Sequence, residues 1–203
     1  VNAERAGNFP NLLPIASAPA KKENELVMGT VALISPMKNH LEIIKALQTL
    51  EAVITWHIYG PVEDAAYWQQ CKELIQQLPS MISDQYHGEL PPAELASAMN
   101  KLQLFIMPSK SENFGHALLE AFSAGKPVIT TDTTPYKNLQ REKAGATVSA
   151  TSLASELPEA IRFFAAMQQD EFSVYTANAA SFARNFSAAE QLRKQYQHLF
   201  TTA

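Results

Sequence analysis

Cysteine is almost absent from the sequence, and its scarcity excludes whole classes of protein. The chain has 203 residues and a single cysteine, Cys71. One cysteine cannot form a disulfide within the chain, and a cysteine-based metal site is not expected. We therefore expect a protein of a reducing compartment, the cytoplasm, and interpret Cys71 as a small residue packed in a helix.

Charge of one sign and long apolar runs are also lacking. Charged residues make up 18% of the chain, the net charge is −4, and no basic run is longer than Lys21-Lys22. A nucleic-acid-binding surface needs a basic patch or stripe, so nucleic acid is not an expected partner. No apolar stretch approaches the ~20 residues of a transmembrane helix. The first residues also lack the basic and apolar regions of a signal peptide.

What the chain does have is a regular alternation of apolar strand-length segments with amphipathic helix-length segments. Strands are expected at 26–35, 52–60, 81–88, 102–108, 126–132 and 145–150. Helices are expected at 40–50, 63–78, 92–101 and 115–125, and then at 153–167, 170–186 and 188–200. Because the spacings are too long for hairpins, they predict an α/β fold with a Rossmann-like, doubly wound parallel sheet of about six strands. We expect a linker over 1–25, a ligand-binding sheet domain over 26–150, and C-terminal helices over 151–203 that pack on the same domain.

The strand-to-helix turns are where such a sheet binds ligands. One of them, PSKSENFG (108–115), leads into an apolar helix and holds Glu112 and Gly115. The first N–H groups of a helix carry positive partial charge and suit a phosphate, and a glycine lets a ligand approach closely. Carboxylates accept hydrogen bonds from sugar hydroxyls. Glu112, Glu120 and the amides between them therefore suggest a nucleotide-sugar site, with one acid for the ribose and the other for a second sugar.

Both acids also have an ordinary structural interpretation. Glu112 can interact with the helix dipole, and Glu120 can be a solvated helix residue. Glu120, however, lies between Leu119 and Ala121 in a strongly apolar helix. A carboxylate buried there would need partners.

The five histidines show no metal-ligand spacing. His57 is expected to be an ordinary strand residue, and His40 and His87 to be a capping and a turn residue. His116, at a helix start, is a candidate contact for a phosphate or a sugar.

The stretch from Ser111 to Asp132, SENFGHALLEAFSAGKPVITTD, combines an acid, a Phe-Gly turn, a helix with a second acid, and Ala-Gly-Lys-Pro-Val before a strand. This order resembles the Glu-x7-Glu signature of retaining, nucleotide-sugar-dependent glycosyltransferases with the GT-B fold, the glycosyl transferases group 1. ISPMKN (34–39) is similar to the family's Arg-x4-Lys phosphate segment, and YHGELPPAELASAM (86–99) resembles its base-binding turn. FPNLLP (9–14) is similar to its interdomain linker, and the resemblance covers roughly residues 8–145.

The resemblance implies a role for each matching residue. Two would be catalytic: Glu112 would stabilise the oxocarbenium charge of the transferred sugar, and Lys38 would neutralise the diphosphate leaving group. The ribose would be held by Glu120. Other donor contacts would come from Asn113, Phe114, Gly115 and His116, and near the base from Gly88, Glu89, Leu90 and Tyr59. The donor would be a UDP-sugar or a GDP-sugar, and no prosthetic group or metal is implied when Lys38, amides and a helix dipole carry the positive charge.

Two positions depart from the family pattern. Leu33 stands where the family has its phosphate-binding arginine, which leaves Lys110 as the candidate substitute. After the strand ending near Asp132, TTPYKNL replaces the frequent Gly-Gly pair, so Pro135 and Tyr136 are expected to stiffen that loop.

The length allows one of the two Rossmann-like domains of a GT-B enzyme. The sequence begins with Val1 rather than Met, so we expect the N-terminal acceptor-binding domain of the same protein to be missing and this piece alone to be inactive. The full-length protein would transfer a sugar to a glycan or lipid-linked acceptor, in the cytoplasm or at the inner membrane face. Two alternatives remain: a non-catalytic, degenerate nucleotide-sugar-binding module, which Leu33 favours, and another GT-B enzyme such as a sugar-nucleotide epimerase or a phosphorylase.

Overall fold

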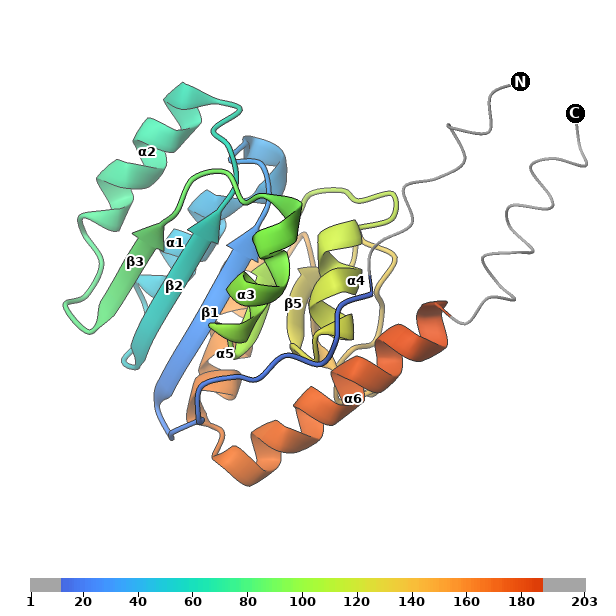
Figure 1. Ribbon diagram of the computed structural model, residues 1–203. Coiled ribbons are helices and arrows are strands. Elements are labelled where there is room, and N and C mark those ends of the chain that lie inside the picture. The colour runs from blue at the N-terminus through green and yellow to red at the C-terminus, as the bar shows by residue number, and fades with distance from the viewer. Residues whose placement is uncertain (1–11, 188–203) are drawn as a thin grey trace, which may run out of the picture.

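The computed structural model describes residues 12–187 and contains one sheet of six parallel strands (Figure 1). The strand order is β3-β2-β1-β4-β5-β6. The strands are β1 (Glu25–Val31), β2 (Val53–Tyr59), β3 (Ile82–Tyr86), β4 (Leu104–Met107), β5 (Val128–Thr131) and β6 (Gly145–Val148). The order reverses direction between β1 and β4, and such a switch point opens a crevice at the carboxyl ends of the strands.

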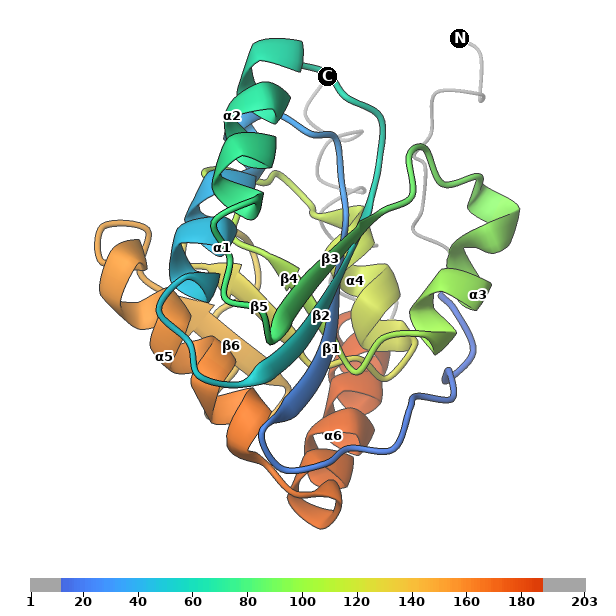
Figure 2. The same ribbon diagram turned by 90° about the vertical axis from the view of Figure 1, so that its left-hand side faces the viewer.

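Helices cover both faces of the sheet (Figure 2). One face carries α1 (His40–Leu47), α2 (Ala65–Ile75) and α5 (Leu153–Ala166), and the other carries α3 (Leu95–Asn100) and α4 (His116–Ser123). The last helix, α6 (Gln169–Ser187), begins against α5 and continues along α4. Two short 3-10 helices, η2 (Pro36–Lys38) and η3 (Pro92–Glu94), precede α1 and α3. The predicted α/β fold is therefore confirmed.

Strand β4 shows how the sequence builds the two cores. Leu104 and Ile106 pack into the cluster under α1 and α5, whereas Phe105 and Met107 pack into the cluster under α3 and α4. Successive side chains of a strand point to opposite faces, so a strand buried on both sides must be apolar throughout. Burying each of these side chains stabilises the fold by roughly 1.5–3 kcal/mol.

Several elements begin or end at other residues than the sequence predicts. The first strand ends at Val31 rather than Ser35, because Ile34 leaves the sheet ladder and forms an isolated bridge with Val62. The predicted helix 92–101 opens with the 3-10 turn η3 and is α-helical only from Leu95, since two consecutive prolines occupy its start. The predicted helix 188–200 lies outside the described residues.

The described part of the linker, residues 12–24, has no regular structure and follows the surface of the domain. The amides of Leu13 and Ala16 donate to the Ser123 hydroxyl and the Ala124 carbonyl, at 2.8 and 3.0 Å. Lys126, fully buried, donates through Nζ to the Ser17 carbonyl at 3.2 Å, and burial lowers its pKa to about 8. The linker is thus bonded to the α4 end of the domain.

None of the helices in the described part of the chain is both long and apolar enough to cross a membrane.

Candidate functional site

The candidate site forms where the loops after β1 and β4 meet. Lys38 ends η2 in the first loop, Glu112 lies in the second, and their side chains form an ion pair between Nζ and Oε1. The two side chains are only 18% and 13% exposed. Since β1 and β4 are neighbours at the switch point, the topology itself brings the two predicted catalytic residues together.

Two further hydrogen bonds hold these loops against each other. The Lys110 amide donates to the Met37 carbonyl at 2.9 Å, and the Asn39 side chain donates to the Pro108 carbonyl at 2.8 Å. Asn39 is buried and has left-handed backbone angles (φ 58°, ψ 36°), which asparagine tolerates better than most residues. Asn39 was not predicted to belong to the site, although an asparagine between Lys38 and a helix start is a signal for such a turn.

Gly115 forms the entrance to α4. Its φ is +70°, and a Cβ there would lie 2.9 Å from Leu118 Cδ1 and 3.1 Å from Tyr136 Cε2. Both the backbone angle and the crowding require glycine. Its carbonyl accepts from the Leu118 amide at 3.0 Å, so the helix begins directly after it and directs its first N–H groups toward the loop that holds Glu112.

Tyr136 supports this turn from behind and was not predicted to belong to the site. It is fully buried, and its hydroxyl donates to the Gly115 carbonyl at 3.4 Å. Burial raises the pKa of Tyr136 well above its usual range, and the negative charges of Glu112 and Glu120 raise it further. Glu112 and Glu120 therefore lie close enough to act on one tyrosine, although Glu120 belongs to the second turn of α4.

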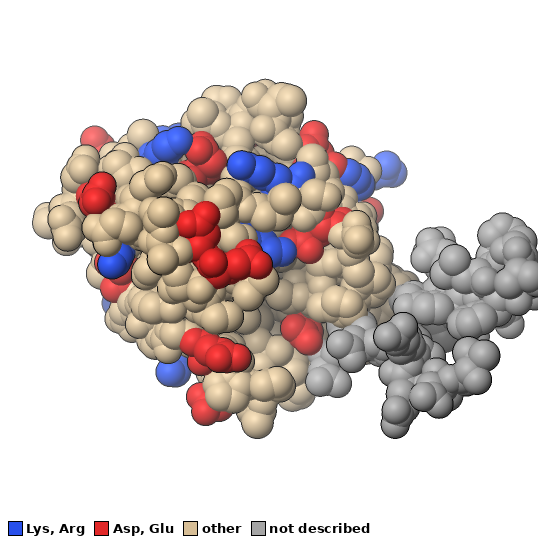
Figure 3. Space-filling model, turned by 90° about the horizontal axis from the view of Figure 1, so that it is seen from above, with Lys and Arg blue, Asp and Glu red and all other residues tan. Residues whose placement is uncertain are grey.

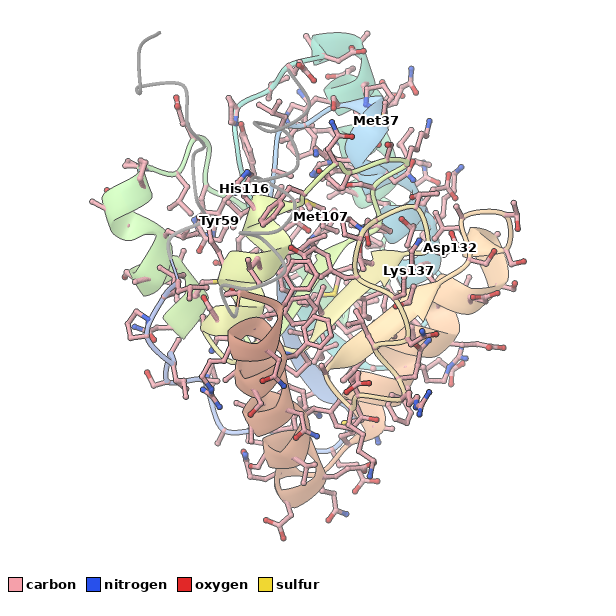
Figure 4. All side chains as sticks on the ribbon, turned by 90° about the vertical axis from the view of Figure 1, so that its right-hand side faces the viewer. Met37, Tyr59, Met107, His116, Asp132 and Lys137 are labelled. Carbon is pink, nitrogen blue, oxygen red and sulfur yellow. The ribbon has the colours of Figure 1, made fainter. Side chains whose placement is uncertain are left out.

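The residues between the two acids differ in exposure. Asn113 and His116 are exposed, while Phe114 is half-buried, with its ring 4.7 Å from that of His116 and 6.2 Å from that of Phe186. Figure 4 looks onto this region and labels His116 at the start of α4, Met107 at the end of β4 and Tyr59 at the end of β2.

The predicted base-binding turn, Gly88 to Leu90, follows β3 at the same edge of the sheet. It is joined to the end of β2 by the Gly60 amide, which donates to the Gly88 carbonyl at 2.7 Å. Tyr59 is only 3% exposed, because the His87 ring stacks on it at 4.4 Å between centroids. Burial raises the pKa of the Tyr59 hydroxyl. Glu89 is exposed, and Leu90 packs against the cluster that also receives Phe114.

The two departures from the family pattern have different surroundings. Leu33 is 43% exposed. Lys110 lines a hollow of about 490 Å³ with Glu42, Tyr67 and Thr151, a lining that includes neither Lys38 nor Glu112. In the described residues, Lys38 is therefore the lysine that the structure joins to Glu112.

Seen from above, the described surface shows acidic and basic groups interspersed rather than one continuous patch (Figure 3). Residues 12–187 contain no group of three or more histidine, cysteine, aspartate or glutamate side chains arranged to hold a metal ion.

Comparisons with known proteins give the same fold and a family. Sulfoquinovosyl transferase SQD2 of Arabidopsis thaliana is 32% identical over 68 residues, which are 34% of this chain and 12% of that protein. The structure of Anabaena Alr3699/HepE in complex with UDP and glucose has a TM-score of 0.68 at 19% identity, covering 86% of this chain and 49% of that one. Sucrose-phosphate synthase from Thermosynechococcus elongatus has a TM-score of 0.68 at 20% identity, covering 88% and 46%.

The chain thus spans less than half the length of these relatives. The family described as glycosyl transferases group 1 matches residues 15–182, from the linker into the second half of α6. The chain belongs to the group 1 glycosyltransferases.

Proposed function

We propose that this chain is the donor-binding domain of a retaining glycosyltransferase that transfers a sugar from a nucleoside diphosphate sugar to a glycan or lipid-linked acceptor. The observation that carries the proposal is the Lys38–Glu112 ion pair, set at the sheet's switch point beside the N-terminus of α4. A cation, a carboxylate and helix N–H groups at one place match the charges of a diphosphate joined to a sugar.

In this proposal Lys38 and Glu112 take different roles when the donor binds. Lys38 and the first N–H groups of α4, with Asn113, Phe114 and Gly115, neutralise the diphosphate that leaves. Glu112 accepts hydrogen bonds from the transferred sugar and stabilises its oxocarbenium charge. These groups supply the positive charge without a metal ion.

The nucleoside is bound on either side of this centre. Glu120 binds the ribose hydroxyls, and Gly88, Glu89 and Leu90 form the base turn, with Tyr59 behind His87. His116 is the further contact at the start of α4. UDP is the favoured nucleotide because the similar HepE structure contains UDP and glucose, and GDP is the second choice.

The acceptor site is proposed to belong to a second, N-terminal domain, so this chain alone should not transfer sugar. The relatives' greater length supports a second domain. The buried Cys71 supports a cytoplasmic location, at the inner membrane face when the acceptor is lipid-linked.

A titration of the chain with UDP, GDP and ADP, followed by NMR amide shifts, tests the donor-binding role. We expect binding of one of them, with shifts in the loops around Lys38 and Glu112. Absence of binding to all three up to millimolar concentration contradicts the proposal.

A non-catalytic module is the second candidate, and the exposed Leu33 favours it. In the full-length protein, Glu112→Ala then leaves function intact, whereas a large loss of sugar transfer excludes the non-catalytic module.

Product analysis distinguishes our proposal from other GT-B enzymes. A new glycosidic bond with retained anomeric configuration supports our proposal, and an isomerised donor indicates an epimerase.

A further inference from the structure

Two histidines form a hydrogen bond directly beneath the predicted base turn. His57, on β2, and His87, the residue before Gly88, approach to 2.9 Å between Nδ1 and Nε2, with ring planes 13° apart. His57 is 8% exposed, whereas His87 is exposed. This hydrogen bond therefore joins His57 to the residue that precedes the turn.

The His87 ring is fixed from a second direction by Tyr59, whose ring lies 4.4 Å away and 12° from parallel. The His87 amide extends the β2–β3 ladder by donating to the Ile58 carbonyl at 2.9 Å. Beyond it, Gly88 has φ +75°, and a Cβ there would meet nothing within 4 Å. The turn is thus anchored on one side and open on the other.

The hydrogen bond requires that at least one ring be neutral, since two imidazolium rings are both donors only. Burial lowers the pKa of His57. It also lowers the pKa of His87, which is the less buried of the two. The charge of His87 also lowers the pKa of His57, and Lys101, just after α3, lowers the pKa of both rings. The Tyr59 ring stacks against both histidines. These surroundings disfavour a second proton on the pair. When strong enough acid adds it, both rings become donors and the contact breaks.

We propose that His57 is a positioning residue that, through His87, holds the Gly88–Leu90 turn in its nucleobase-binding shape, and that proton uptake by the two histidines weakens nucleotide binding. The proposal rests on the proposed donor-binding function.

The test compares UDP affinity of the wild type with that of two variants at pH 7.5 and pH 5, by calorimetry. His57→Phe keeps an aromatic ring but removes the hydrogen bond, and should weaken UDP binding about fivefold at pH 7.5, the loss of about one hydrogen bond. The ratio should shrink as the pH is lowered, because a second proton on the wild-type pair removes the same bond. A ratio of affinities cancels the titration of the UDP phosphate itself. His57→Asn, which keeps an acceptor near the Nδ1 position and does not titrate, should restore most of the affinity.

The matched control is Thr55→Val, two residues earlier on β2. It removes a side-chain hydrogen bond to Ser83 between the same two strands, away from the turn, and should leave UDP affinity unchanged. The thermal stability of each variant separates unfolding from a local effect.

The proposal is overturned if His57→Phe binds as the wild type does, if its ratio is the same at both pH values, or if Thr55→Val loses as much. If the wild type binds UDP and the ratio is one at pH 7.5, the positioning role fails while the proposed function stands. A fivefold ratio that does not change with pH refutes the proton coupling. If the wild type binds none of UDP, GDP and ADP at pH 7.5, the proposed function fails, and this inference fails with it.

Discussion

At the scale of single residues, the site depends on one cation and one carboxylate that come from different loops. Lys38 and Glu112 are 74 positions apart and meet because β1 and β4 are adjacent. In the absence of a donor, the two charges neutralise each other in a partly buried place. The arrangement therefore holds both groups close to the position proposed for the diphosphate.

The first prediction concerns the charge of Glu112. In the full-length protein, Glu112→Gln should lower the rate of sugar transfer about 100-fold or more, because the developing positive charge loses its carboxylate. UDP affinity should stay the same or rise, since Lys38 no longer shares its charge. The exposed Glu142→Gln is the control, and a transfer rate within twofold of wild type in Glu112→Gln contradicts the catalytic assignment.

The second prediction separates backbone strain from crowding at two glycines. Gly115 and Gly88 have φ of +70° and +75°, but only Gly115 lacks space for a Cβ. Gly88→Ala should cost about 1 kcal/mol of unfolding free energy, and Gly115→Ala about 2–3 kcal/mol, because it adds the contacts with Leu118 and Tyr136. Urea denaturation measures both, and equal losses would show that the crowding has no effect.

The predictable part of the site is the part encoded in short segments. Lys38, Glu112 and Gly115 could be predicted because each belongs to a local motif whose spacing is visible in the sequence. Tyr136 could not be assigned to Gly115, nor His57 to His87, because those contacts join residues 21 and 30 positions apart and depend on strand register. From the sequence, Tyr136 was predicted only to stiffen the loop that follows Asp132.

At the scale of elements, each helix packs on the rest of the domain through an apolar face. The buried face of α1 contains one polar residue. His40, its first residue, is fully buried near the rings of Trp56 and Tyr67. In the described residues, neither of its ring nitrogens has a hydrogen-bond partner. Burial lowers the pKa of His40 to about 4, with a smaller contribution from the charge of Lys38.

The third prediction follows from that pKa. Because the folded value of about 4 lies below the unfolded value of 6.5, the neutral form is favoured by folding. The contribution of His40 to the free energy of unfolding is fully present above pH 6.5. It falls by up to about 3 kcal/mol as the pH drops toward 4. His40→Leu should remove this part of the acid dependence, and unfolding free energies measured between pH 7 and pH 4 would show it. Parallel pH curves for variant and wild type contradict the assignment.

The order and type of the elements could be read from the sequence because apolar periodicity reports which side of each segment is buried. The first and last residues of each element were harder to predict, because they depend on tertiary hydrogen bonds. The bond from the Thr147 amide to the Gln140 side chain, and the return bond from Gln140 to the Thr147 carbonyl, are one example. These two hydrogen bonds use backbone groups of the edge strand β6, and the apolar pattern of the sequence does not predict them.

At the scale of the whole molecule, the described residues form a Rossmann-like layer structure, and the chain spans less than half the length of its relatives. The docked linker and α6 both contact α4, so the N- and C-terminal described segments meet beside the candidate site's helix. The family follows from the match over residues 15–182 and the fold from the sheet topology, whereas the proposed donor and mechanism rest on a few loop residues.

The proposed donor-binding role requires that Lys38 bind the diphosphate of the nucleotide. Its most direct test is a calorimetric titration of UDP into the wild type, Lys38→Met and Lys110→Met, with thermal stability as the check on folding. We predict that Lys38→Met binds UDP at least about tenfold more weakly, while Lys110→Met stays within about twofold of wild type, because Lys110 lines a different hollow. Loss of affinity in Lys110→Met with wild-type binding in Lys38→Met would show that Lys38 does not bind the diphosphate.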